Sequence, residues 1–499
     1  MSRRLTAILM GGAIVSKVLA FAREVLMAQV IGASLVADSF RGAVSAVMLP
    51  LAFLQSEGVP AILIPMHREW QAKGEAPERL ASFTVAFTSL SLILMLVLQA
   101  IGAWWIDKLV GGFSSEGRAL ALEFVRVMAL GMPASTLLNC LAAGEIALGR
   151  TRLTNARTIA LNIAMISGIV TAGVTGHVSA LGWAFALAFI SLGLWGFWMM
   201  WREGHLRFRG LTAGKVIMEG WEFLRRLFPL LAIPAAEQCH VWIERSLASR
   251  LVTGAVASMD YARTLTESTL PLICQPVGLA VLASHPPKDP QAQIEAIARP
   301  ILAIALPASV FLFLFAPDIV RLVFFRGAFT EEGVILTSQA LRGIAVGLWA
   351  ATLGLILMRV LNSSGRNVLA ASILVLAYAV NIAFNLTVSW VAPAGDTSVL
   401  MLGLGETTRS LVLLMGIVLA LECRAHLFRL ILIAVLPAML MVFAGWQVQQ
   451  AFTGTFTRLL MGGLAYGAVT AIAIAILMPA LRQTALTFVQ SWLSRARKA

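Results

Sequence analysis

The ten residues GASLVADSFR at positions 32–41 return in altered form as GAVASMDYAR at positions 254–263. In both copies an aspartate follows the first glycine by six positions, and an arginine follows the aspartate by three. Residues three apart lie on one face of a helix, so each copy predicts a helical Asp–Arg pair. Each copy also opens a long apolar segment. A duplicated half with ionisable residues at membrane depth is typical of a transporter built from two helical bundles around a central path.

The rest of the composition is that of a helical membrane protein. Of the 499 residues, 59% are hydrophobic and 13% are charged, whereas soluble domains carry roughly 25% charged residues. Apolar runs of about 20 residues recur from end to end and predict an all-α polytopic fold with no soluble domain of appreciable size. Lys17 and Arg23 interrupt the first run, so we interpret it as a membrane helix and not as a signal peptide.

About fourteen apolar segments are expected to be transmembrane helices. They span residues 5–31, 33–65, 79–106, 119–147, 155–177, 178–201, 226–252, 254–285, 294–317, 333–363, 367–391, 395–421, 426–449 and 456–481. Basic residues concentrate in alternate connections, at residues 68–79, 150–157, 202–226, 288–299, 366 and 424–429, and in the tail. The opposite connections hold mainly Lys108, Arg118, Arg321, Arg326 and Arg458. The positive-inside rule therefore predicts that both termini are cytoplasmic, which requires an even number of spans.

The repeat divides the chain into two halves of the same orientation, related by an axis along the membrane normal. We expect an N-terminal six-helix lobe at residues 1–201, a cytoplasmic linker at 202–225 and a C-terminal six-helix lobe at 226–421. Residues 422–499 have no counterpart in the repeat. They are expected to hold two additional helices and a basic cytoplasmic tail.

Charged residues gather in the helices that carry the repeat. They are Lys17, Arg23, Asp38, Arg41 and Glu57 in the first half, and Asp260 and Arg263 in the second. Each charge costs about 3 kcal/mol or more at the bilayer centre unless it faces a cavity or a partner. Salt bridges within the bundle are one explanation. We favour a cationic cavity wall for an anionic substrate, with a phosphate as the expected anion, and take these residues as candidate substrate ligands.

Oxygen-bearing side chains in three later segments form a candidate ion site. They are Glu244, Asn381, Asn385 and Thr407. Such groups facing one another across a bundle can bind Na⁺ or carry a proton, although interhelical hydrogen bonding explains them equally well. His240 lies on one helical face with Glu244, but a zinc site needs a further strong ligand, and the sequence indicates none. We therefore expect no structural or catalytic metal.

Several function classes are disfavoured by the sequence. The net charge of +13 reflects the loop bias and contact with anionic membrane lipids, so we expect no nucleic-acid partner. The four cysteines stand singly among apolar residues, without metal or redox spacing. No phosphate-cradling glycine loop, nucleophile elbow or metalloprotease pair is present. The chain is therefore expected not to be an enzyme.

The motifs resemble those of the MurJ/MviN family of lipid-linked cell-wall precursor flippases, within the superfamily of multidrug and polysaccharide exporters. SKVLAFARE at residues 16–24, ADSF at 37–40 and SEG at 56–58 are similar to the family's N-terminal motifs. IERSLAS at 243–249, DYARTL at 260–265 and FRGAFT at 325–330 are similar to its later ones. The resemblance covers essentially the whole chain.

This resemblance implies two six-helix lobes around a V-shaped cavity, with two extra helices beside a groove for a lipid tail. It implies alternating access, with Lys17, Arg23 and Arg263 binding a diphosphate beside Asp38 and Glu57. Some members of the family have a Na⁺ site, to which Glu244, Asn381, Asn385 and Thr407 are the nearest candidates here. The implied partner is a polyprenyl-diphosphate-linked saccharide in the bacterial inner membrane, moved to the periplasmic leaflet by a monomer.

One departure from the family leaves the substrate open. The family usually carries an arginine pair shortly before the third motif, but residues 49–55 hold no basic residue. Lipid II and an exopolysaccharide repeat unit are therefore both expected substrates. A cation-coupled multidrug antiporter of the same fold is the alternative, but it favours an acidic, aromatic cavity over a basic one. A membrane glycosyltransferase would need a catalytic carboxylate in a large extramembrane loop.

Overall fold

The structure is a computed structural model that describes residues 3–267, 290–391 and 396–479. In that part of the chain every regular element is a helix. Eleven helical segments there are long and apolar enough to cross a membrane. This confirms the all-α polytopic fold and makes the predicted number of about fourteen spans approximate. The distal half of the predicted segment 254–285, Lys288 and the basic tail after residue 479 lie outside the described residues.

The chain forms two compact units. Unit 1 holds Met1–Ala257 with Arg326–Thr330, and unit 2 holds Ser258–Phe325 with Glu331–Ala499. The helices of unit 1 are α1 (Arg3–Val30), α2 (Leu35–Ala52), α3 (Gly58–Ala72), α4 (Ala76–Val110), α5 (Ser115–Met128), α6 (Met132–Ala147), α7 (Arg152–Thr175), α8 (Ala180–Arg202), α9 (Ala213–Leu227) and α10 (Ala232–Ala248). A further helix at residues 255–267 leads into unit 2. There the helices are α12 (Pro290–Leu314), α13 (Ala316–Phe324), α14 (Glu331–Ser363), α15 (Asn367–Val391), α16 (Asp396–Ala420), α17 (Arg424–Ala451) and α18 (Thr455–Leu477).

Some of the predicted segments are divided in the structure. The segment expected at 33–65 is two helices, because α2 ends at Ala52 and α3 begins at Gly58. Pro50 lies in the last turn of α2, where it removes a backbone donor and disfavours continuation of the helix. The segment expected at 294–317 likewise bends at Phe315, where α12 gives way to α13. Apolar composition predicted both spans but not these breaks.

The connection between the two halves contains an amphipathic helix, α9. On its inner face Phe223 packs against Phe83 and Phe87 of α4, with ring centroids 4.6 and 5.0 Å apart. Beside this cluster Arg79 donates to the buried Glu219 at 2.7 Å. The residues predicted as a polar linker at 202–225 thus include a helix that is anchored to unit 1 by aromatic packing and by one ion pair.

A network of charges holds the ends of α6, α7 and α8 together. Buried Glu145 accepts hydrogen bonds from Arg152 Nε at 2.6 Å and from the Leu153 amide at 2.7 Å. Arg150 and Arg152 both reach Glu203, which follows the last residue of α8. The hydrogen bond from Arg152 lowers the pKa of Glu203 to about 2. The pair therefore remains ionised at neutral pH, where it ties α7 to α8.

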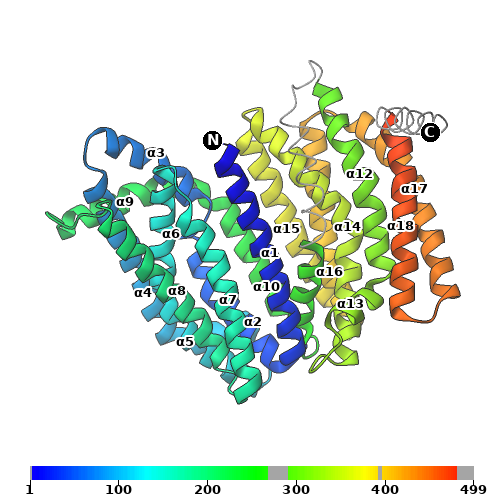
Figure 1. The fold of residues 1–499 in the computed structure, drawn as a ribbon, viewed down its shortest axis with the longest axis horizontal. Helices are drawn as coiled ribbons and strands as arrows, with labels where there is room; N and C mark the ends of the chain where they lie inside the picture. The colour runs from blue at the N-terminus through cyan, green and yellow to red at the C-terminus, as the bar shows by residue number, and fades with distance from the viewer. Residues whose placement is uncertain (1–2, 268–289, 392–395, 480–499) are drawn as a thin grey trace, which may run out of the picture. The chain divides into compact units, whose positions relative to one another are not determined.

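Unit 2 is built on close helix packing. Helices α14 and α16 meet through Gly343, Gly347 and Gly403, where an added methyl group would lie within 3 Å of the opposite backbone. Small residues allow this approach in membrane helices, where lipid supplies no hydrophobic drive. Phe315 lies in a buried cluster with Met441 and Val448 of α17 and Val469 of α18. The predicted additional helices α17 and α18 therefore pack side by side and against α12, as Figure 1 shows at the orange-to-red end of its colour scale.

The helix that opens the second repeat is capped by a residue of the first. Asp38 of α2 is 1% exposed, and its two carboxylate oxygens accept hydrogen bonds from the amides of Gly254 at 2.6 Å and Ala257 at 2.8 Å. In the first repeat, Ser34 caps its own helix by accepting from the Ala37 amide. The equivalent of Ser34 in the second copy is Val256, which has no acceptor oxygen. Asp38 supplies the acceptors that these first-turn amides need.

Glycine is required where this cap forms. Gly254 has φ of +90°, a conformation that strains residues with a side chain. A methyl group on Gly254 would also lie 2.7 Å from the carbonyl oxygen of Ala33. The first glycine of each repeat has the same role, since Gly32 has φ of +74° and is equally crowded by the Ala328 carbonyl.

We predict that Asp38→Ala destabilises the protein strongly. It would leave two buried amides without acceptors, each costing about 1–3 kcal/mol. Asp38→Asn keeps one acceptor oxygen and should cost less, and Ser34→Ala, which removes one long contact, should cost about 1 kcal/mol. Thermal unfolding of the purified protein in detergent measures the order. An Asp38→Ala protein as stable as the Ser34→Ala control would contradict the capping role.

Candidate functional site: paired arginines in each unit

A shared carboxylate joins two arginines in unit 1. Glu24 of α1 accepts from Arg23 at 2.7 Å and from Arg41 of α2 at 2.6 Å. Arg23 also donates to Asn162 of α7 at 3.0 Å. Burial of Glu24 and Arg41 to 10% side-chain exposure removes most of their water, and the close pairing offsets that cost. Glu24 is therefore the shared acceptor of the two guanidinium groups in this cluster.

The other candidates in unit 1 are in different settings. Lys17 is exposed on α1. Glu57 is exposed at the start of α3 and makes no capping hydrogen bond. Asp38 has both oxygens engaged by the helix cap described above. The structure thus brings Arg23 and Arg41 together on Glu24, whereas it places Asp38 in a backbone contact that spacing alone did not predict.

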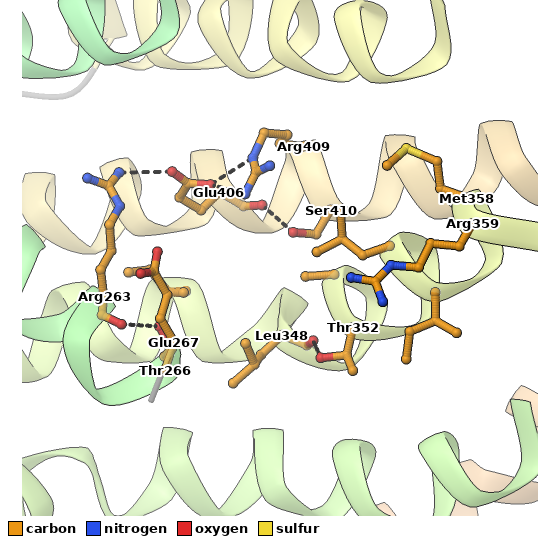
Figure 2. A pocket seen from close by; sticks show the side chains of 14 residues that line it. Arg263, Thr266, Glu267, Leu348, Thr352, Met358, Arg359, Glu406, Arg409 and Ser410 are labelled. Carbon is orange, nitrogen blue, oxygen red and sulfur yellow. Dashed lines mark hydrogen bonds and ion pairs between the residues drawn. The ribbon is translucent and has the colours of Figure 1, made fainter. Parts of the chain in front are cut away.

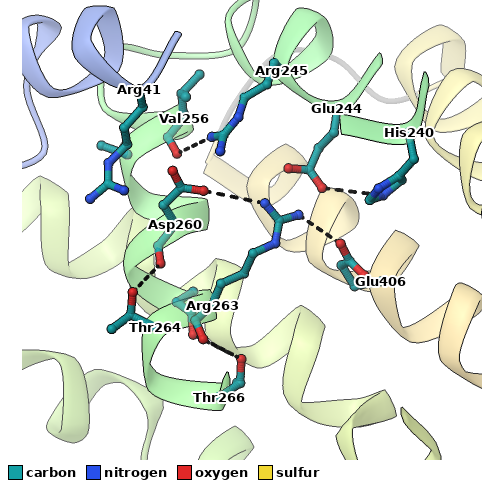
Figure 3. Close-up of polar contacts among 12 residues, drawn as sticks. Arg41, His240, Glu244, Arg245, Val256, Asp260, Arg263, Thr264, Thr266 and Glu406 are labelled. Carbon is teal, nitrogen blue, oxygen red and sulfur yellow. Dashed lines mark hydrogen bonds and ion pairs between the residues drawn. The ribbon is translucent and has the colours of Figure 1, made fainter. Parts of the chain in front are cut away.

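Unit 2 contains a second cluster in which two arginines share one glutamate. Arg263 contacts Glu406 of α16 at 2.8 Å and Asp260 at 3.5 Å (Figure 3). Arg409 contacts the other oxygen of Glu406 at 2.8 Å and lies over the Tyr378 ring at 5.3 Å. The arginine of each repeat, Arg41 or Arg263, therefore shares one glutamate with a second arginine. Sequence spacing predicted the repeat arginines but not their common partners.

The cluster in unit 2 opens into a pocket of about 290 Å³. Its charged lining residues are Arg263, Glu267, Arg359, Glu406 and Arg409, and the hydroxyl groups of Thr352 and Ser410 also face it. Figure 2 shows Arg359 reaching in from α14, on the side opposite Arg263. Arg359 makes no ion pair with the described residues of its unit. Arg359 was not among the site residues predicted from the sequence. Its charge inside the predicted membrane segment 333–363 could have identified it as a candidate site residue.

The candidate ion ligands fall on separate helices. In unit 2, Asn385 donates to Asn381 Oδ1 at 2.7 Å, and both amides are buried on α15. The Thr407 hydroxyl on α16 donates to the Gly343 carbonyl at 2.7 Å. In unit 1, the Glu244 carboxylate lies 3.8 Å from His240 one turn earlier on α10 (Figure 3). The oxygen Oδ1 of Asn385 is buried without a hydrogen-bond donor, so it has a lone pair free for a cation or a water molecule.

Comparisons with known proteins place this geometry in a family. A sequence profile described as lipid II flippase MurJ matches residues 27–465. The lipid II flippase MurJ of Burkholderia cenocepacia is 26% identical over 437 residues, which cover 82% of each chain. A solved lipid II flippase MurJ in an inward closed conformation has a TM-score of 0.80 at 18% identity, over 94% of this chain and 99% of that one. An inward-facing multidrug transporter of the MATE family has a TM-score of 0.61 at 15% identity, over 83% of this chain and 95% of that one.

Both structural matches show that this chain shares their fold, and the sequence profile shows to which family the chain belongs. The profile covers most of the chain, including Arg41 and the arginine cluster of unit 2. The chain is a multi-pass membrane protein of a transporter family and not an enzyme. It belongs to the MurJ family of lipid II flippases.

Proposed function

We propose that this protein moves an undecaprenyl-diphosphate-linked peptidoglycan precursor of the lipid II type from the cytoplasmic to the periplasmic leaflet of a bacterial inner membrane. The observation that carries the proposal is the basic pocket of unit 2, built on membrane helices of a chain in the flippase family. Three arginines and two glutamates line this pocket, so its net charge is positive. A diphosphate is the anionic group that such a substrate brings.

The size of the pocket indicates which part of the substrate it holds. Its volume of about 290 Å³ lies at the lower end of the range for small-molecule sites. A disaccharide with a peptide would not fit, whereas a diphosphate and part of one sugar would. Guanidinium groups bind phosphate oxygens in a bidentate manner. We therefore assign the diphosphate to Arg263, Arg359 and Arg409, with Glu406 orienting two of them.

The unit 1 cluster has the chemistry for a second contact of the same kind. Arg23 is 28% exposed although it is paired with Glu24, so part of its guanidinium remains accessible. Lys17 lies on the same helix. We assign Lys17, Arg23 and Arg41 to the phosphate-binding residues, and Asp38 and Glu57 to structural support. Alternating access would then present these groups to the two leaflets in turn.

Two alternatives gain less support than the lipid II precursor. An exopolysaccharide repeat unit carries the same diphosphate, but the matching family profile and the Burkholderia relative are both lipid II flippases. A multidrug antiporter shares the fold at a lower TM-score. The basic pocket also disfavours cationic drugs, because like charges repel at short range. We further propose that the protein acts as a monomer with both termini in the cytoplasm.

For ion coupling we propose Na⁺ at Asn381, Asn385 and Thr407 of unit 2. Amide and hydroxyl oxygens are suitable ligands for such a hard cation. The partnerless Oδ1 of Asn385 supports this assignment. A proton carried by Glu244 is the alternative.

We predict that Arg263→Ala and Arg409→Ala each reduce flipping of lipid II at least tenfold. Loss of one charge-assisted phosphate contact costs about 1.5–3 kcal/mol, and each 1.4 kcal/mol is about tenfold. Glu406→Gln breaks the same ion pairs but keeps both arginines, so its affinity for the substrate should be equal or higher.

The rate of lipid II flipping is measured in proteoliposomes with fluorescent lipid II and an impermeant quencher. Arg118→Ala, which replaces an exposed arginine of unit 1, is the control. If Glu406→Gln and Arg263→Ala are equally impaired, the arginines serve only to pair with Glu406.

We also predict that Asn385→Leu removes the dependence of flipping on Na⁺. The substitution keeps a side chain of similar size but removes the amide oxygen. Flipping should be measured across a range of Na⁺ concentrations, with N-methylglucamine as the replacement cation. Wild-type protein that flips equally well in both salts would exclude Na⁺ coupling while leaving the substrate assignment unaffected.

A further inference from the structure

A second polar cavity in unit 2 lies at the helix ends, and none of its lining residues is shared with the pocket of Arg263. It has a volume of about 780 Å³. Leu314, Pro317 and Asp318 line it where α12 gives way to α13, and Gln449, Gln450, Thr453, Thr455 and Arg458 line it where α17 turns into α18. Arg321 and Arg342 complete the lining. The loop charges predict that this end of the helices is periplasmic.

Positive charge dominates this cavity. Of its three arginines, Arg321 forms an ion pair with Glu331, and Arg458 lies 3.8 Å from Asp318. Arg342 makes no ion pair with the described residues of its unit. Its Nε donates to the Phe313 carbonyl at 3.3 Å, and its guanidinium lies 5.9 Å from the Phe313 ring centroid. A charge on a membrane helix is tolerated where it faces a cavity, and an anion bound in that cavity would supply the partner that Arg342 lacks among the described residues of its unit.

The surrounding contacts hold the arginines in place without using all their donors. Arg458 Nε donates to the Phe452 carbonyl at 2.6 Å, and Gln449 donates to the Leu314 carbonyl at 2.7 Å. The first bond lies within the α17–α18 turn, and the second joins the end of α12 to α17. A guanidinium has five N–H donors, so Arg342 and Arg458 each retain donors for a ligand in the cavity. The lining is therefore ordered before an anion arrives.

An apolar stripe runs away from this cavity along α17. Gln450 lines the cavity, and Trp446, Phe443 and Met439 lie on the same helical face at successive turns. Their exposed fractions are 52%, 61% and 64%. A hydrocarbon chain that covers this stripe would place its polar end at Gln450. The occupant that satisfies both features is a lipid with a phosphate group.

We propose that the cavity of Arg321, Arg342 and Arg458 binds the phosphate of an anionic lipid in the periplasmic leaflet, with the lipid's hydrocarbon chain along the α17 stripe. Two sources have this chemistry, an anionic phospholipid and a polyprenyl phosphate. Arg342 provides the uncompensated charge, and Arg458 and Arg321 add donors on either side. This proposal does not depend on the substrate of the flippase.

The test measures lipid binding to the full-length protein in detergent by native mass spectrometry. The probes are dioleoylphosphatidylglycerol, undecaprenyl phosphate and, as a lipid without phosphate, dioleoylglycerol. We expect at least one phosphate-bearing lipid to bind more tightly than dioleoylglycerol. Arg342→Gln should weaken that binding about tenfold, as expected for one charge-assisted contact. Arg342→Lys keeps the charge and should lose less. Preference for one phosphate lipid over the other identifies the source.

Two further variants make the result independent of folding defects. Thr453→Glu places a carboxylate at the exposed rim of the cavity, in the loop between α17 and α18, and should weaken binding of the phosphate lipids without disturbing a helix. Arg118→Gln, an exposed arginine that the loop charges place on the same side of the membrane, should bind lipid as the wild type does. If Arg342→Gln and Thr453→Glu bind phosphate lipids as tightly as the wild type, the arginines only hold the helix ends together, and the proposal is wrong.

Discussion

A charge inside a membrane helix must find a partner of opposite sign, and this constraint organises both units. In unit 1, Glu24 forms ion pairs with Arg23 and Arg41. In unit 2, Glu406 forms ion pairs with Arg263 and Arg409. A lone guanidinium in hydrocarbon costs about 3 kcal/mol or more, whereas sharing a carboxylate lowers that cost for two arginines at once. Each shared glutamate holds two guanidinium groups close together. In the proposed function these guanidinium groups bind the diphosphate.

The two aspartates of the repeat have diverged because their neighbours differ. Asp260 stays beside Arg263, three residues later, as the spacing predicts. Asp38 instead accepts from the Gly254 and Ala257 amides, so it is committed to the start of the second repeat. Ser34 stands at the cap position of the first helix, whereas the second helix begins at residue 255 and has Gly254, without a side-chain acceptor, at its cap position. Duplicated sequence thus gave two helices with unlike caps.

Helix α14 carries two arginines that the shared-glutamate arrangement does not compensate. Arg359 faces the pocket of Arg263, and Arg342 faces the cavity at the opposite end of the helix. They are 17 residues apart, or roughly 25 Å along a helix. A phosphate at either place would supply the missing negative charge. The two proposals therefore assign an anionic group to two separate positions of unit 2.

The sequence by itself determined the all-α membrane fold and the repeat with its arginines, because apolar run length and local spacing are read along one chain. Its motifs indicated the family by resemblance. It did not determine the breaks at Phe315 and between α2 and α3, the helix in the linker, or the partners of the charges. Glu406 lies 143 positions after Arg263, and Gly254 lies 216 after Asp38. Such pairs depend on which helices pack together, and every glutamate in an apolar segment looks alike until that packing is known. Only the tertiary structure decided that Asp38 caps a helix, that Arg359 faces a pocket, and that Arg342 has no carboxylate partner among the described residues of its unit, because each depends on side chains brought together from distant helices.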